Sequence, residues 1–152
     1  MMMDQEKWDE HFMRQALMQA EMAAEEDEVP VGAVIVVDQT IIAKAYNQTE
    51  KLKDATAHAE MIAITSAANY LNSKYLNDCT LYVTLEPCLM CGTASNWSQI
   101  GRVVYGATDL KKGYQNFSDP VLHKRTEVTT GVLEQECAAI LTNFFAQKRK
   151  SF

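Results

Sequence analysis

The sequence of 152 residues lacks three features that would place it in other classes of protein. No apolar run approaches the roughly 18 residues that a membrane-spanning helix requires. No basic patch followed by an apolar stretch is present near its start, so we expect no secretory signal and a cytoplasmic protein. No internal repeat, low-complexity tract or linker divides the chain, and its length suits a single domain, which we expect over residues 1–152.

Positive charge is also scarce. The formal net charge is −6 and the isoelectric point is near 5.0, which argues against a protein that coats nucleic acid nonspecifically. Residues 1–100 carry six Lys or Arg against fifteen Asp or Glu, a net charge of −9, whereas residues 101–152 carry eight against five, a net charge of +3. This distribution leaves two interpretations open, a local basic face or ordinary solvated surface charge.

Cysteine occurs four times, and a chain without an export signal is expected to keep cysteines as thiols or metal ligands. Cys79 and Cys137 lie in apolar surroundings, so we expect them to be small core residues. Cys88 and Cys91 instead form a C-x-x-C pair directly after Pro87. This pair is therefore the candidate for chemistry.

Hydrophobic periodicity predicts four helices and five strands. A short turn at residues 38–39 joins the first two strands, which we expect to form an antiparallel hairpin, and the later alternation of strands with helices indicates parallel crossovers. A mixed sheet covered by helices on both faces follows. We expect helices at 4–26, 59–71, 88–99 (opened by Pro87) and 132–150, and strands at 31–38, 40–47, 79–86, 102–108 and 126–131.

Two predicted helix starts carry metal-ligand chemistry. Cys88 and Cys91 are three residues apart, so one helical turn can present both to one ion, and His58 supplies a third ligand from another helix start. Three protein ligands leave the fourth tetrahedral position to water, the arrangement of a catalytic zinc, and we expect one zinc per chain. Glu60 can take a proton from that water and return it to a substrate nitrogen. This set fits hydrolysis at an electrophilic C–NH2 carbon.

Other interpretations of these motifs explain less. C-x-x-C before a helix also occurs in redox proteins, but the order of strands and helices differs from the thioredoxin-like order. A structural zinc ribbon would need a second C-x-x-C, and a catalytically silent zinc dimer that binds RNA or protein would not need the carboxylate of Glu60. H-x-E, an interval of 27 residues between Glu60 and Cys88, and then P-C-x-x-C together form the signature of zinc nucleobase deaminases.

From about Trp8 to Arg149 the chain resembles the bacterial tRNA-specific adenosine deaminase family, in the stretches VPVGAVIV, AYNQT, DATAHAE, CTLYVTLEPCLMC, IGRVVYGATD and GVLEQECAAILTNFF. The resemblance implies a three-layer α/β/α cytidine-deaminase-like fold with a mixed five-stranded sheet, and a homodimer. It also implies conversion of the wobble adenosine of a tRNA anticodon to inosine. A free-base or nucleoside deaminase, such as guanine deaminase, uses the same motif and is the alternative.

The resemblance also implies roles for individual residues. It makes His58, Cys88 and Cys91 the zinc ligands and Glu60 the proton shuttle. Segments 92–97 and 113–118 depart from the family pattern, and in the second Tyr114 and Phe117 either form a lid over a small base or pack the loop onto the sheet. The implied substrate contacts are Asn47, Ala59, Asp109, Lys111, Phe144 and Phe145.

Overall fold

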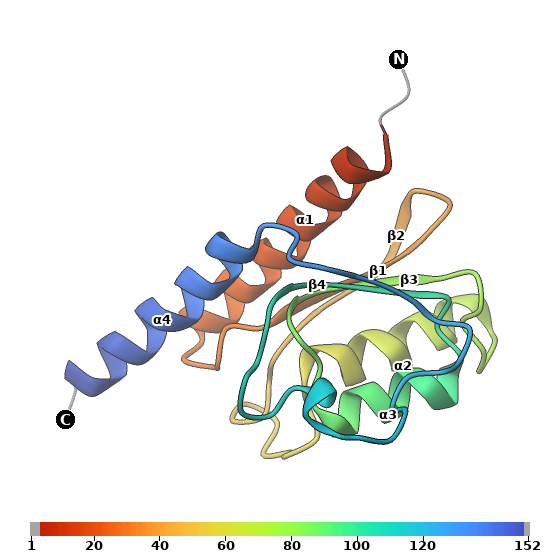
Figure 1. Ribbon diagram of the computed structural model, residues 1–152. Coiled ribbons are helices and arrows are strands. Elements are labelled where there is room, and N and C mark those ends of the chain that lie inside the picture. Colours follow the sequence, from red (N-terminus) through yellow and green to blue (C-terminus); the bar gives the residue numbers. More distant parts are fainter. Residues whose placement is uncertain (1–3, 151–152) are drawn as a thin grey trace.

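A computed structural model describes residues 4–150 and places one five-stranded sheet between two pairs of helices (Figure 1). Helix α1 and the start of α4 lie on one face of the sheet and α2 and α3 cover the other, so the prediction of a three-layer α/β/α fold is confirmed. The elements are α1 (Gln5–Glu25), β1 (Gly32–Val37), β2 (Thr40–Tyr46), α2 (Ala59–Leu71), β3 (Thr80–Leu85), α3 (Leu89–Ser98), β4 (Arg102–Ala107), the 3₁₀ turn η1 (Tyr114–Asn116), β5 (Glu127–Thr130) and α4 (Glu134–Lys150).

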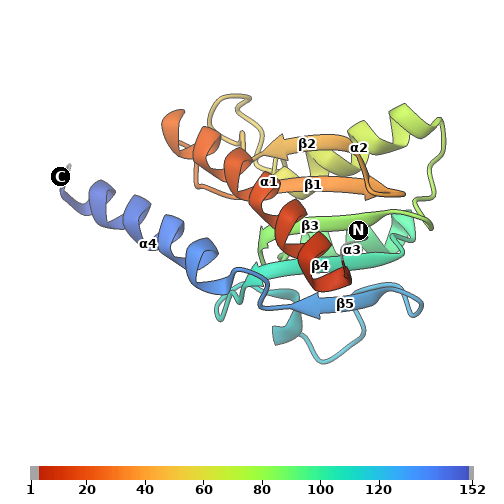
Figure 2. The same ribbon diagram turned by 90° about the horizontal axis from the view of Figure 1, so that it is seen from above.

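The sheet is mixed, with the strand order β2-β1-β3-β4-β5 that Figure 2 shows from above. β1 is antiparallel to both β2 and β3, whereas β3, β4 and β5 run parallel. The β1–β2 turn places Asp38 at φ 48° and Gln39 at φ 59°, the left-handed pair that matches the twist of a two-residue hairpin. The predicted hairpin and parallel crossovers are both confirmed.

Helix α1 packs tightly onto the sheet through an apolar stripe. Phe12, Met13 and Ala16 are buried along it, as expected from residues spaced three and four apart. At Gly32 the helix approaches the strand directly, because a Cβ there would lie 2.0 Å from the carbonyl oxygen of Ala16. None of the helices within residues 4–150 has the length and apolar character needed to cross a bilayer.

Two predicted helix boundaries are wrong for local reasons. Pro87 lies outside α3, because Cys88 is extended (φ −71°, ψ 176°) and serves as the N-cap, so the helix begins at Leu89. Helix α4 begins at Glu134 and not at residue 132, because Gly131 (φ 79°) and Leu133 (φ 52°) take left-handed conformations that a right-handed helix cannot include.

A buried carboxylate ties α1 to the sheet. Asp9 accepts hydrogen bonds from both terminal nitrogens of Arg102 (2.8 and 2.7 Å) and from the Tyr82 hydroxyl (2.8 Å). Burial alone would raise the pKa of Asp9, but hydrogen bonds from Arg102, Tyr82 and Gln5 outweigh it and lower this pKa below its usual 3.8. Because the folded pKa lies below the unfolded one, this group stabilises the fold above about pH 4, and the stabilisation is lost as the pH falls through the folded pKa.

Asp9→Asn is therefore expected to lower the free energy of unfolding at pH 7 by about 3 kcal/mol, because Arg102 is left without its charged partner in a mostly buried setting. The difference from the parent should shrink as the pH falls below 4. Urea unfolding at pH 7 and at pH 3 measures both effects. Glu10→Gln changes an exposed carboxylate on the same helix and should leave both values unchanged; an equal loss in the two variants would contradict the role given to Asp9.

Candidate active site

Two side chains at helix starts are free of the capping role that such positions usually have. His58 is the N-cap of α2 and Cys88 is the N-cap of α3, and neither side chain makes a capping hydrogen bond. N-cap residues are commonly Ser, Thr, Asp or Asn, whose oxygen binds a free helix N–H. Here the two side chains turn toward each other instead, and Cys91, in the first turn of α3, joins them.

The three side chains form a metal-ligand set with zinc geometry. The Nδ1 atom of His58 lies 3.6 Å from the Sγ atom of Cys88 and 3.5 Å from that of Cys91. A zinc ion with bonds of about 2.3 Å to sulfur and about 2.0 Å to nitrogen, at tetrahedral angles, separates these atoms by about 3.5 Å. Within residues 4–150, this is the one group of three or more His, Cys, Asp or Glu side chains placed to share an ion.

The electrostatics of this group favour a thiolate. A hydrogen bond from the Cys91 thiol, together with one from His58, lowers the pKa of Cys88 to about 4 against the opposing effect of burial. The same hydrogen bond to Cys88, together with burial, raises the pKa of Cys91. The hydrogen bond to Cys88 likewise raises the pKa of His58. Cys88 is thus ionised at neutral pH, in the form that binds metals, at a helix N-terminus whose dipole favours negative charge.

Glu60 lies beside this group in the first turn of α2. Its side chain is only 4% exposed, and burial raises its pKa to about 7. A carboxyl group with this pKa can both accept and release a proton near neutral pH, which is the property that general acid–base catalysis requires. Glu60 also lines the same cavity as His58 and Cys88.

That cavity has a volume of about 660 Å³, within the usual range for a small-molecule site. Asn47 is buried at its wall, and Lys111 and Phe145 line it from the loop after β4 and from α4. The structure therefore brings four of the predicted substrate contacts to the cavity beside the metal-ligand group: Asn47, Asp109, Lys111 and Phe145.

The other two predicted substrate contacts, Ala59 and Phe144, do not line this cavity. Phe144 and Phe145 both line a neighbouring hollow beside Lys148, but only Phe145 also reaches the cavity, because on a helix adjacent residues point about 100° apart. Ala59 is fully buried in the core, and its side chain is not among those lining the cavity. Asp109 does line it, but its carboxylate accepts the backbone N–H groups of Lys111 and Lys112 and so stabilises a turn.

The divergent segment 113–118 does not form a lid in this structure. Tyr114 packs edge-on against Tyr105, with ring centroids 6.3 Å apart. Phe117 is exposed, and neither Tyr114 nor Phe117 lines the cavity. The structure favours the packing interpretation of Tyr114.

Two buried carboxylates near the cavity were not singled out from sequence. Glu86 accepts the backbone N–H groups of Asp109 and Gln115 at 3.1 and 3.0 Å. Glu28 accepts those of Glu50 and Lys51 at 3.0 and 2.7 Å. Each carboxylate thus fixes a loop next to the cavity by long-range bonds to backbone. A sequence signal was available for Glu86, an acidic residue in an apolar setting at the end of a strand, whereas Glu28 ends the acidic run 25–28 and does not stand out from it.

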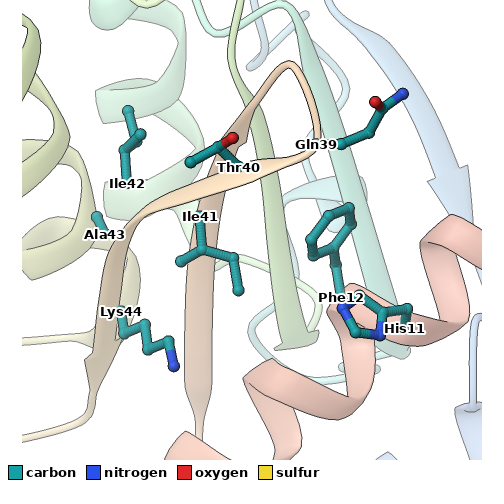
Figure 3. Close-up of a pocket in the computed structure, with 8 residues that line it drawn as sticks. All are labelled: His11, Phe12, Gln39, Thr40, Ile41, Ile42, Ala43 and Lys44. Atoms are coloured by element: carbon teal, nitrogen blue, oxygen red, sulfur yellow. The ribbon is translucent and has the colours of Figure 1, made fainter.

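A separate hollow lies between α1 and the edge strand β2. His11 and Phe12 of the helix lie on one side of it and residues 39–44 of the hairpin on the other (Figure 3). None of the metal-ligand side chains, nor Glu60, lines it. The chemistry therefore belongs to the cavity beside His58.

Comparison with known proteins identifies similar sequences and structures. Residues 6–107 match the family described as the cytidine and deoxycytidylate deaminase zinc-binding region. A tRNA-specific adenosine deaminase of Agrobacterium fabrum is 46% identical over 144 residues, which cover 91% of this chain and 95% of the relative.

Solved structures are similar as well. A structure from work on A-to-I editing by tRNA deaminases at the wobble position has a TM-score of 0.81 at 46% identity, covering 86% of this chain and 99% of the other. Guanine deaminase from Bacillus subtilis has a TM-score of 0.63 at 38% identity, covering 70% of this chain and 66% of the other.

Proposed function

Since the chain belongs to the cytidine and deoxycytidylate deaminase family, and within it to the tRNA-specific adenosine deaminases, we propose that this zinc-dependent hydrolase converts adenosine to inosine at the wobble position of a tRNA anticodon. The observation that carries the proposal is the cavity beside the metal-ligand group. Its walls include Lys111 and Phe145, which are exposed, so a base in the cavity can stay connected to a strand outside it. We propose that one domain carries both chemistry and recognition.

The reaction needs a ligand set, a proton carrier and a base-binding wall. His58, Cys88 and Cys91 hold the zinc, which when bound supplies the Lewis acidity that activates a water molecule at neutral pH. Asn47 contributes its buried side-chain amide, which can donate to and accept from the edge of a flipped base. The base must leave its stack because C6 cannot be reached inside one, and a single-stranded loop makes that step cheap.

Glu60 moves the protons. Its carboxylate takes a proton from the attacking water as the new C6–O bond forms, and delivers that proton to N1 of the adenine. The carboxylate then takes the proton of the new C6 hydroxyl group and transfers it to the amino group on C6; the C6–N bond breaks, C6 becomes a carbonyl and ammonia leaves, so adenosine and water become inosine and ammonia. A carboxyl pKa of about 7 suits both halves of this exchange.

Incubation with an anticodon stem-loop that carries adenosine at the wobble position tests the proposal. We expect inosine in the RNA and one ammonia per inosine, with little ammonia from free guanine, cytosine or adenosine. Absence of inosine, combined with rapid ammonia release from guanine, would move the assignment to a free-base deaminase.

We also propose that the enzyme is a cytoplasmic homodimer. None of the four cysteines forms a disulfide, which suits a reducing compartment. Trp97 is 83% exposed and Leu89 is also exposed on α3, the helix that carries a predicted zinc ligand, and a second copy packing there would bury both. Sedimentation should give about twice the monomer mass of 17.1 kDa, and a monomer at micromolar concentration would contradict the dimer.

A further inference from the structure

Leu110 is 84% exposed, more than any other large apolar side chain within residues 4–150. It follows β4 on the loop that lines the active-site cavity and is itself one of the lining residues. A single exposed leucine on a loose surface loop would need no explanation. The loop that carries Leu110 is instead fixed by hydrogen bonds, so the exposure of Leu110 needs a physical reason.

The loop is held in one conformation by bonds to a buried carboxylate. Glu86 is 3% exposed and accepts backbone N–H groups from both ends of the loop, at Asp109 and Gln115. Glycine at position 113 allows the loop to close on itself, because a Cβ there would lie 2.6 Å from the backbone carbonyl oxygen of Asp109 and 2.1 Å from Oε2 of Glu86.

The residues around Leu110 are fixed as well. The turn closes through bonds from the backbone N–H groups of Lys111 and Lys112 to the Asp109 carboxylate. The side-chain amide of Asn116 donates to the carbonyl oxygen of Leu110 at 3.2 Å. Leu110 is therefore held in solvent by an ordered loop.

The surroundings of Leu110 indicate what covers it. Lys111 and Lys112 are the next two residues and line the same cavity, and Phe145 is a second exposed apolar side chain on its wall. Cations suit the phosphates of a nucleic acid strand, and apolar side chains suit the face of a base or a sugar. A strand that enters the cavity with one base places its neighbouring nucleotide on this rim.

We propose that Leu110 is a specificity-determining residue that packs against the nucleotide adjoining the one being deaminated. Glu86 acts as a positioning residue, since it holds the loop that presents Leu110 before the substrate arrives. The inference rests on the proposed function, because it requires a polynucleotide substrate.

Leu110→Ala tests the contact. Loss of this apolar area should raise KM for the anticodon stem-loop about tenfold and leave kcat unchanged. Any slow activity on free adenosine should be unaffected, because a nucleoside has no neighbour to touch Leu110. The matched control is Leu52→Ala, which removes a 53% exposed leucine from a loop outside the cavity lining and should keep the parental KM.

Stem-loops with an abasic nucleotide on the 5′ or the 3′ side of the target locate the contact. On one of the two, the parent and Leu110→Ala should have the same KM, because the base that Leu110 covers is missing. Parental KM in Leu110→Ala, or equal losses on both abasic substrates and on adenosine, would overturn the proposal while the parent still makes inosine. A parent that makes no inosine would overturn the proposed function and this inference together.

Hydrogen exchange tests the positioning role of Glu86 separately. In Glu86→Gln, hydrogen exchange should quicken in peptides that contain residues 109–115 and stay parental over α2, because one backbone N–H loses its acceptor. KM for the stem-loop should rise in parallel with kcat retained. Parental exchange in the loop, or a fall in kcat without a rise in KM, would contradict a positioning role.

Discussion

Glu60→Gln is expected to lower kcat on the anticodon stem-loop by about 10²–10⁴-fold, the range that general acid–base catalysis contributes. The substituted side chain has nearly the same shape and still fits the buried position next to the metal-ligand group. It has no carboxylate, so it can neither take a proton from water nor return one to N1 or to the leaving amine. Single-turnover inosine formation measures the chemical step directly.

The zinc content separates this effect from loss of the metal site. Since Glu60 is not a ligand in the proposed set, Glu60→Gln should keep about one zinc per chain and bind the stem-loop with near-parental affinity. Glu10→Gln, on the opposite face of the sheet, should keep full activity. A Glu60→Gln enzyme that deaminates at close to the parental rate would remove the proton-carrying role from this residue.

Cys91→Ser is expected to abolish activity by emptying the metal site. A serine oxygen is a poor substitute for a thiolate toward zinc, and the two remaining ligands cannot hold the ion against competing water. Zinc per chain, measured after gel filtration in metal-free buffer, should fall from about one to well below one. Inosine formation should fall with it by at least about 10³-fold, because the activated water is lost as well.

Cys79→Ser is the matched control. Cys79 is a buried free thiol beside β3, outside the metal-ligand group, so its variant should lose some stability and keep its zinc. Equal zinc loss in both variants would show that the effect comes from general destabilisation. A Cys91→Ser protein with one zinc and full activity would show that the predicted ligand set is wrong.

Local patterns were sufficient to predict the layers of the fold and the ligand group. The stripe through Phe12 and Ala16 defines α1, and a β-branched run defines β1, because burial imposes a period on these residues. The metal ligands follow from spacing, since His58 and Cys88 sit at helix starts that the chain itself marks. The fold of this family was therefore accessible without coordinates.

Contacts between a side chain and a backbone segment far away in the sequence could not be predicted from local patterns. Glu86 and Glu28 hold loops that lie more than 20 residues away, and an acidic residue in sequence carries no sign of which N–H groups it will meet. Phe144 and Phe145 are neighbours within α4, and the sequence did not indicate which of the two would line the cavity. Pro87 lies outside α3 because Cys88 is extended and not helical, and the sequence alone did not indicate this.

Helix α4 differs from the other helices in how little the fold depends on it. Cys137, in its first turns, is its one buried side chain, and Figure 2 shows the helix continuing beyond the sheet. Substitutions at exposed positions usually change stability by less than about 0.5 kcal/mol, yet Phe145 lines the cavity. Over evolutionary time this helix can therefore diverge in sequence, and with it the choice of RNA partner, without passing through ancestors that fail to fold.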